Sequence, residues 1–504
     1  MIDHIRLKNY KSFEDIVIPI KQLTVLLGAN NTGKSAVINA LLMLKQTANE
    51  CDEAYKSALK INGMVVSLGK AENLCYMQKD KTQFEIEIGI SNYDTKAYEL
   101  IWEGVQNRFW SITALSKQKY DIHRNKMTRR EIKESFEFLR NANKDNKETM
   151  ITVFFPEIKE RMDILNEEVF DSIADIFEEL IEPNNSLKLH FFFACEDSEK
   201  IQLKRCVVTL AGKTIIDYSK ESLLSDYTSF SEEDATIIDK VFNGNVPVFY
   251  CFDNVESLEK KREFNFKTFY LIKVLKKTLS IFKNEFADNS VNYTMPLRDI
   301  PSRLYVLDKA KRADMLDCFG GSDVVNVLKN NKSVKDDVNK WLSHFNINVD
   351  VNEVADFYYR IDVKEGNISL NIPDVGFGIS QILPIITQGF ALKKNMLMLI
   401  EQPEIHLHPK MQADIADLLI SIQKDNRGGR KRFLVETHSE YLLRRLKRRI
   451  GEGKINHDDV AICSFQKDKE SNIVSVKEYE VSSNGAFPWP EDFMDDDLWK
   501  DNIA

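Results

Sequence analysis

The chain has few cysteines, and none of them is arranged for a metal site or a disulfide framework. Seven cysteines occur in 504 residues, and no two of them form a Cys-x-x-Cys pair. Scattered thiols in an odd number argue against a zinc site and are typical of proteins in a reducing compartment. The sequence therefore predicts reduced thiols and a cytoplasmic location.

Long apolar runs and a secretory leader are also lacking. The longest apolar stretches, such as FFFAC and MLMLI, fall far short of the roughly 20 residues that span a bilayer. The opening residues, MIDHIRLKNYKSFED, carry a charge every few positions, which is not the pattern of a signal peptide. These absences predict no membrane partner.

A surplus of basic charge is lacking as well. The net charge of −9 argues against general affinity for nucleic acid, which needs a basic face. Between Arg427 and Arg449, however, nine Lys or Arg residues stand against two Glu. Two interpretations of this stretch stay open: a solvated loop and helix face, or a contact with the phosphate backbone of DNA or RNA.

The composition is that of a globular protein, with 43% hydrophobic and 29% charged residues. Short β-rich runs open the chain, and strands alternate with helices again from about residue 346, which predicts an α/β fold with a largely parallel sheet and flanking helices. The charged, amphipathic stretch between them predicts helices without sustained heptads. We therefore expect two lobes, residues 1–115 and 346–504, split by a mostly helical insertion at 116–345 with a β-hairpin near 187–218.

The strongest motif is GANNTGKS, residues 28–35, which matches the G-x-x-x-x-G-K-[ST] pattern of a phosphate-binding loop (P-loop). It lies between the strand LTVLL and the helix AVINALLML, so backbone N–H groups and a helix N-terminus can point at phosphate oxygens. Lys34 is expected to reach the β- and γ-phosphates, and the Ser35 hydroxyl to ligate magnesium. The predicted cofactors are ATP and Mg²⁺. The nucleotide-binding residues expected in and after the loop are Asn30, Asn31, Thr32, Gly33, Lys34, Ser35 and Ala36.

Three further stretches carry weaker signals, each of which also has a purely structural explanation. DVGFGISQ, residues 374–381, opens a helix for which Ser380 is a candidate N-cap. LMLIEQPEIHLHP, residues 397–409, is an apolar strand that ends at Glu401, a candidate magnesium-supporting carboxylate. RFLVETHSEYLL, residues 432–443, is another buried strand, which ends at Thr437-His438.

Gln402 follows Glu401 at the position where P-loop ATPases often carry a second acid that activates water. An amide cannot accept a proton at neutral pH, although it can orient water by hydrogen bonding. We therefore expect slow hydrolysis. Alternatively, Gln402 is a harmless variant and Glu404 is the base.

The order of these motifs resembles that of ABC-type ATPase heads. The sequence is similar to OLD-like and RecF/SMC-like ATPases, in particular to bacterial AAA family ATPases with a DUF3696-like C-terminus. The similarity lies in IRLKNYKSFED, GANNTGKS, DVGFGISQILPI, IEQPEIHLHP and VETHSEYLLRRL. It extends to YTMPLRDIPSRLY, residues 293–305, and to the closing GAFPWPEDFMDDD.

The resemblance implies a composite site. Glu401 would support the metal bound by Ser35, while Ser380, with Gly378 and Gln381, would be presented to the γ-phosphate by a second subunit. His438 would sense the γ-phosphate beside Gln402 and Glu404, and Lys11 and Phe13 would lie near the nucleotide. Gln78 and Gln83 are the candidates for the coupling glutamine of such heads.

The resemblance also implies a function. It predicts an ATP-dependent switch that dimerises through its heads and controls a separately encoded effector, such as a nuclease or toxin, in bacterial antiphage defence. One alternative is a DNA-repair or chromosome-associated ATPase that contacts DNA. Another is a metal-dependent hydrolase that uses Glu404, His406 and His408. No intrinsic nuclease is expected, because the DDD at 495–497 lacks the strands that a nuclease site needs.

Overall fold

The computed structural model describes residues 1–50, 55–76, 82–93, 95–96, 98–99, 167–182, 185–254, 266–287, 290–296, 301–307, 321–424, 431–468 and 471–489.

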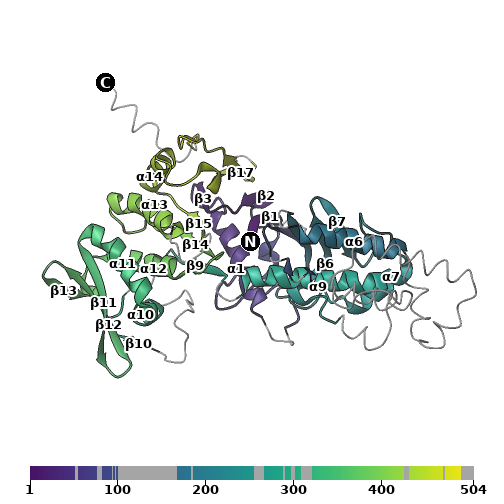
Figure 1. Ribbon diagram of the computed structural model, residues 1–504, viewed down its shortest axis with the longest axis horizontal. Coiled ribbons are helices and arrows are strands. Elements are labelled where there is room, and N and C mark those ends of the chain that lie inside the picture. The colour runs from purple at the N-terminus through teal and green to yellow at the C-terminus, as the bar shows by residue number, and fades with distance from the viewer. Residues whose placement is uncertain are drawn as a thin grey trace, which may run out of the picture.

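A sheet of 13 strands forms the centre of the fold. Figure 1 labels several of its strands. Its strands are β1 (Ile2–Tyr10), β2 (Phe13–Pro19), β3 (Leu23–Gly28), β4 (Gln83–Ile90), β5 (Leu187–Cys195), β6 (Ile201–Leu210), β7 (Lys213–Ser219), β8 (Ser222–Leu224), β9 (Val291–Thr294), β14 (Leu397–Glu401), β15 (Arg432–Glu436), β16 (Val460–Lys467) and β17 (Val474–Tyr479). Their order is β8-β7-β6-β5-β4-β1-β2-β17-β16-β3-β15-β14-β9.

The half of this sheet around β3 is parallel. Strand β3 pairs in parallel with β15 and β16, and β14 pairs in parallel with β15 and β9. Every residue of β3, β14 and β15 is buried, because helices cover both faces. One face packs on α1 (Lys34–Ala48) and α9 (Phe266–Phe286), and the other on α12 (Phe377–Ala391), α13 (Pro409–Gln423) and α14 (Glu440–Gly451). The predicted α/β fold with a parallel sheet around the P-loop is confirmed.

The other half of the sheet is antiparallel. In β1, the fully buried Ile5 and Leu7 alternate with the partly exposed Arg6 and Lys8. This alternation is the pattern of a strand in which only one face of the sheet is covered. Strands β4 to β8 continue as a meander, in which the turn between β6 and β7 is Ala211-Gly212, with both φ angles positive. This is the two-residue turn that suits the twist of a hairpin. The hairpin expected near 187–218 therefore belongs to a longer meander that extends the sheet of the N-terminal lobe.

The range expected for the insertion, 116–345, contributes helices and also strands of the main sheet. Its helices include α6 (Glu167–Ile181), α7 (Glu232–Val241), α9, α10 (Gly321–Asn330) and α11 (Lys332–Leu342). Strand β9 also falls in this range, yet it pairs with β14 at the edge of the parallel half. Residues 101–166 lie outside the described residues, so the domain boundaries stay a prediction. Within the described ranges, no helix has the length and apolarity needed to cross a membrane.

A second, small antiparallel sheet precedes α12. It contains β10 (Tyr305–Val306), β11 (Ile347–Ala355), β12 (Tyr358–Glu365) and β13 (Ile368–Asn371). Its buried face shares one apolar core with α10, α11 and α12, which lies beside this sheet in Figure 1.

Candidate functional site

The P-loop connects β3 to α1 and has a shape that only glycine adopts readily at two positions. Gly28 has a φ of 144° and Gly33 a φ of 90°. A Cβ atom at Gly33 would lie 2.5 Å from Ser12 Oγ and 2.8 Å from the Phe13 ring. Gly33 also starts α1 without a side-chain cap, which leaves first-turn N–H groups for an anionic ligand.

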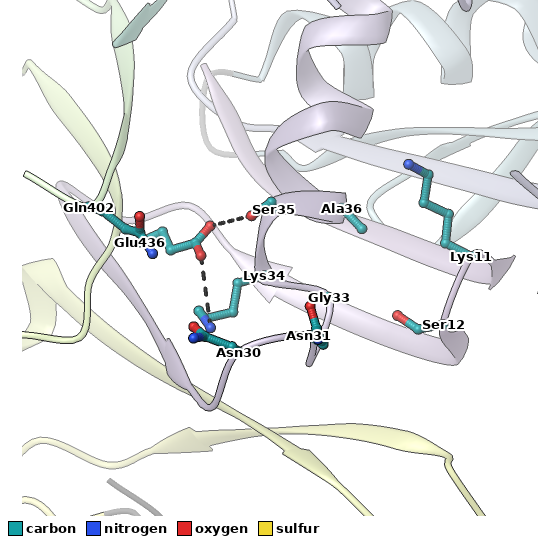
Figure 2. A pocket seen from close by; sticks show the side chains of 10 residues that line it. All are labelled: Lys11, Ser12, Asn30, Asn31, Gly33, Lys34, Ser35, Ala36, Gln402 and Glu436. Carbon is teal, nitrogen blue, oxygen red and sulfur yellow. Dashed lines mark hydrogen bonds and ion pairs between the residues drawn. The ribbon is translucent and has the colours of Figure 1, made fainter. Parts of the chain in front are cut away.

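A pocket of about 700 Å³ opens in front of this loop (Figure 2). It is lined by Lys11, Ser12, Asn30, Asn31, Gly33, Lys34, Ser35, Ala36, Gln402 and Glu436. All of these except Ser12 and Glu436 were expected from the sequence. Of the predicted loop residues, Thr32 does not line the pocket, because its side chain is buried and donates to Ala29 O at 2.8 Å.

The Lys34 ammonium group lies against the P-loop backbone. Its Nζ donates to Gly28 O at 3.0 Å and to Ala29 O at 2.8 Å, and lies 3.8 Å from Glu436 Oε1. Burial lowers the pKa of Lys34, and the carboxylates of Glu436 and Glu404 act in the opposite direction. A buried ammonium group in this loop is what recognition of the β- and γ-phosphates requires.

Two glutamates end neighbouring strands beside Ser35. Glu401 closes β14 and Glu436 closes β15, and the two residues are partners in the parallel register. Ser35 Oγ donates to Glu436 Oε2 at 2.9 Å (Figure 2), while Tyr293 OH donates to Glu401 Oε1 at 2.7 Å. Burial raises the pKa of both carboxyl groups, against the opposing effects of Tyr293 on Glu401 and of Lys34 on Glu436.

These oxygens are chemically suited to magnesium. Mg²⁺ prefers hydroxyl, carboxylate and phosphate oxygens and keeps several waters in its coordination sphere. The Ser35 hydroxyl, with Glu401 and Glu436 behind it, supplies such a donor set next to the phosphate-binding loop. Glu436 was missed by sequence reasoning, although it carries the same signal that identified Glu401, an acid at the end of a buried apolar strand.

Gln402 lines the pocket in a left-handed backbone conformation, with a φ of 43°. Its backbone N–H donates to Glu436 O at 2.8 Å, which holds the two residues side by side. Glu404, the predicted alternative base, lies elsewhere. Its two carboxylate oxygens accept hydrogen bonds from Thr437 Oγ1 at 2.8 Å and from the His438 backbone N–H at 2.6 Å. Glu404 is not one of the residues that line the pocket.

His438 follows directly on the strand end that carries Glu436. Its Nε2 atom is buried and has no hydrogen-bond partner in the part of the chain that the structure describes. Burial lowers the pKa of His438, and the charge of Lys34 lowers it further. A neutral imidazole near Lys34 fits the predicted contact with a phosphate.

The start of α12 lies apart from this pocket. Gly378, Ser380 and Gln381 are in its first turns, and none of them lines the pocket. The expectation that Ser380 is the N-cap is wrong, because the helix begins at Phe377 with Gly376 as its cap. Glycine is tolerated at an N-cap, so the helix starts one turn earlier than the serine suggested.

Several other sequence expectations have a structural role or lie outside the site. Phe13 is buried against Phe465, with ring centroids 6.1 Å apart, and supports the P-loop from behind. Gln83 is exposed at the start of β4 and does not line the pocket. Gln78 and residues 495–497 lie outside the described residues.

The metal-hydrolase alternative gains no support. His408 is the N-cap of α13 and its side chain accepts from the Lys410 backbone N–H. Glu404 is bonded to the segment at 437–438. Among the described residues, no group of three or more His, Cys, Asp and Glu side chains is arranged to hold a metal ion.

The basic stretch is largely neutralised by ion pairs where the structure describes it. Arg445 and Arg449 both bind Asp417, and Arg448 binds Glu452. Residues 425–430, including Arg427, lie outside the described residues. The paired arginines of α14 therefore resemble a solvated helix face more than a phosphate-binding surface.

Comparisons with known proteins give one family match and distant structural likenesses. No curated protein matches the chain. One similar solved structure is the SMC head domain from Thermotoga maritima, with a TM-score of 0.35 and 10% identity, where 94% of this chain and 98% of that chain are covered. Another is the Smc head domain with an extended coiled coil bound to the C-terminal domain of ScpA, from Pyrococcus furiosus. Its TM-score is 0.36 and its identity 10%, where 95% of this chain and 96% of that chain are covered. Both likenesses are distant. The family model of the AAA ATPase domain matches residues 1–443, and the chain belongs to this family of ATPases.

Proposed function

We propose that this ATPase is a nucleotide-dependent switch that binds ATP with Mg²⁺, closes as a homodimer and hydrolyses ATP slowly. Lys34 and the first-turn N–H groups of α1 would bind the phosphates, and Ser35 with Glu401 and Glu436 would hold the metal ion. That ion would supply charge neutralisation on the phosphate oxygens. Asn30, Asn31 and Lys11 would border the nucleotide.

The dimer proposal rests on the separation of the P-loop pocket from the start of α12, which the resemblance predicts to be two parts of one site. The P-loop pocket contains Lys34 and Ser35, but Ser380 and its helix start do not line it. A second copy of the chain can bring its own α12 to the open side of this pocket through an isologous contact, so that two equivalent sites are completed at once.

Slow hydrolysis is proposed because Gln402 lines the pocket where a second acid is usual. ATP would then act mainly as a clamp that keeps the dimer closed. We further propose that the closed dimer controls a separately encoded effector, such as a nuclease or toxin, in antiphage defence. This role rests on the sequence resemblance alone.

Mass measurement by sedimentation tests the switch directly. In ATP and Mg²⁺ the protein should sediment as a dimer or a dimer-based assembly of the 58.3 kDa chain, and in ADP it should dissociate. Monomers in saturating ATP and Mg²⁺ would contradict the proposal.

A further inference from the structure

Two cysteines that are far apart in sequence lie next to each other in the fold. Cys75 Sγ and Cys195 Sγ are 3.5 Å apart across a separation of 120 positions, and both thiols are free. A disulfide needs its two sulfur atoms about 2 Å apart, so a small movement of either segment brings this pair to bonding distance. The geometry therefore permits a covalent link between two distant parts of the chain.

On one side, the segment that carries Cys75 is attached to the end of β5. The segment begins with the short 3-10 helix η1 (Ala71–Leu74), and Cys75 follows it directly. Ala71 N donates to Ser198 O at 2.7 Å, in the turn between β5 and β6. Cys195 is the last residue of β5, and its Sγ also lies 3.4 Å from Ala71 O, as a donor. A disulfide would thus reinforce contacts that already exist.

On the other side, the same segment is attached to the turn that borders the nucleotide pocket. Cys75 forms an isolated antiparallel bridge with Tyr10, the last residue of β1. The Lys11 backbone N–H donates to Leu74 O at 2.7 Å. Lys11 lines the pocket. The segment therefore connects the thiol pair to a residue of the nucleotide site through one backbone hydrogen bond.

The thiol pair also differs chemically from the other cysteines that the structure describes. A hydrogen bond from Cys195 lowers the pKa of Cys75 and outweighs the opposing effect of burial. Thiolates are the form that oxidants attack, and the half-buried Cys195 gives a small oxidant access to the pair. In contrast, burial raises the pKa of Cys206, Cys251 and Cys463. These three thiols should stay protonated and inert.

We propose that Cys75 and Cys195 are a thiol oxidation site, at which hydrogen peroxide forms a disulfide that weakens nucleotide binding. In the first step the Cys75 thiolate attacks peroxide, the O–O bond breaks and Cys75 becomes a sulfenic acid. The hydroxide that leaves takes up the proton that Cys75 released, which gives water. In the second step Cys195 attacks the Cys75 sulfur and the S–O bond breaks, so that the hydroxyl group leaves with the Cys195 proton as a second water. Two thiols lose two electrons, and one peroxide gains them.

The disulfide would act on the pocket by moving the segment. Strand β4 lies between β1 and β5 in the sheet, so movement of Cys75 toward Cys195 is movement away from the end of β1. This stretches the hydrogen bond from the Lys11 N–H to Leu74 O, and Lys11 loses the contact that holds its left-handed backbone, with a φ of 51°. The effect on affinity rests on the proposed function, whereas formation of the disulfide does not.

The test uses the full-length protein before and after treatment with hydrogen peroxide. Free thiols are counted after denaturation, and linked peptides are mapped by mass spectrometry. The count should fall from seven to five per chain, with a peptide that joins Cys75 to Cys195, and dithiothreitol should restore both thiols. Affinity for a fluorescent ATP analogue should fall about threefold or more on oxidation, as expected for one weakened hydrogen bond, and return on reduction.

Single substitutions separate the proposed pair from general oxidation. Cys195→Ser should form no disulfide and should accumulate a Cys75 sulfenic acid that a dimedone probe labels, with an affinity that peroxide does not change. This position is half-buried, so the variant is informative even where Cys75→Ser folds poorly. Cys75→Ser should give neither the disulfide nor the label. Cys206→Ser is the matched control, and it should lose two thiols and respond in affinity as the wild type does.

Three results would overturn the proposal. They are an unchanged thiol count in peroxide, a disulfide that joins any other pair of cysteines, and an unchanged affinity once the Cys75–Cys195 disulfide has formed. Failure of the reduced wild type to bind the ATP analogue would instead refute the proposed function, and the thiol count would still decide whether the disulfide forms.

Discussion

Glu404 holds the backbone of His438 in place: its Oε1 accepts from the His438 N–H at 2.6 Å, while its Oε2 accepts from Thr437 Oγ1 at 2.8 Å. These two hydrogen bonds join the turn after β14 to the turn after β15. Glu404, which the sequence suggested as a catalytic base, thus positions the backbone of His438, the predicted phosphate sensor.

The first prediction concerns this contact. Glu404→Ala leaves two buried donors without an acceptor, which should lower the free energy of unfolding by about 1–3 kcal/mol. Hydrolysis should fall as well, because His438 is displaced. Chemical denaturation measures the first effect, and Glu365→Ala, at an exposed position at the end of β12, is the matched control. A variant with unchanged stability and a lower rate would favour Glu404 as the base.

The second prediction concerns nucleotide binding. Lys34→Ala removes the ammonium group that lies among the P-loop carbonyls, so affinity for a fluorescent ATP analogue should fall at least about 100-fold, equivalent to roughly 2.7 kcal/mol. The circular dichroism spectrum should not change. Lys220→Ala, at an exposed turn between β7 and β8, should bind normally. Equal affinity in both variants would refute the P-loop assignment.

Local chemistry explains what the sequence could predict. A phosphate-binding loop needs its glycines, lysine and serine within eight consecutive positions, so GANNTGKS, the strand before it and the helix after it are recognisable without any tertiary contact. The buried strands LMLIE and RFLVE were identified in the same way, from continuous apolar runs.

Tertiary contacts explain what it could not predict. Ser35 and Glu436 are 401 positions apart, and the role of Glu436 depends on β15 lying between β3 and β14. Strand β9 has only four residues, and its place in the main sheet comes from pairing with β14 rather than from its own pattern. The sequence suggested Glu404 as a base because its hydrogen-bond partners, Thr437 and His438, are distant in sequence and their contact with Glu404 is not visible there.

The third prediction concerns dimer closure. Gly376, the N-cap of α12, is exposed, and a Cβ atom there would have no other atom within 4 Å. Gly376→Arg therefore adds bulk and charge at the helix start without an internal clash. This variant should bind ATP normally but stay monomeric in ATP and Mg²⁺. Ser369→Arg, on the exposed strand β13, should dimerise as the wild type does. Dimers of Gly376→Arg would exclude this end of α12 from the contact.

The fourth prediction concerns pH. Burial acts to lower the pKa of His4, but its hydrogen bonds with Asp3 and Glu87 raise it from 6.5 to about 9. A raised pKa in the folded state means that the ion pairs stabilise fully below pH 6.5, and that this contribution is lost as the pH rises through about 9. His4→Gln should therefore reduce the free energy of unfolding by an amount on the order of 1 kcal/mol at pH 6. Its difference from wild type should have disappeared by pH 10, and a difference independent of pH would contradict this account.

The last prediction concerns Gln402. Its side chain lines the pocket, and its backbone N–H donates to Glu436 O. A carboxylate at position 402 would therefore lie beside the carboxylate of Glu436. Gln402→Glu should raise the single-turnover rate about tenfold or more, because a group that can accept a proton from water then faces the pocket. The neighbouring carboxylate of Glu436 should also raise the pKa of the introduced glutamate, so that the gain in rate is lost as the pH falls.

The matched control for this change is Gln202→Glu, because Gln202 lies in β6, does not line the pocket, and a glutamate there can still accept from Lys204. Faster hydrolysis in Gln402→Glu should shorten the lifetime of the ATP-bound dimer, which sedimentation after a chase with ADP would measure. The clamp proposal depends on the wild type being slow by comparison. A wild-type turnover above about ten per second, the median of well-evolved enzymes, would leave no time for a stably closed dimer and would contradict it.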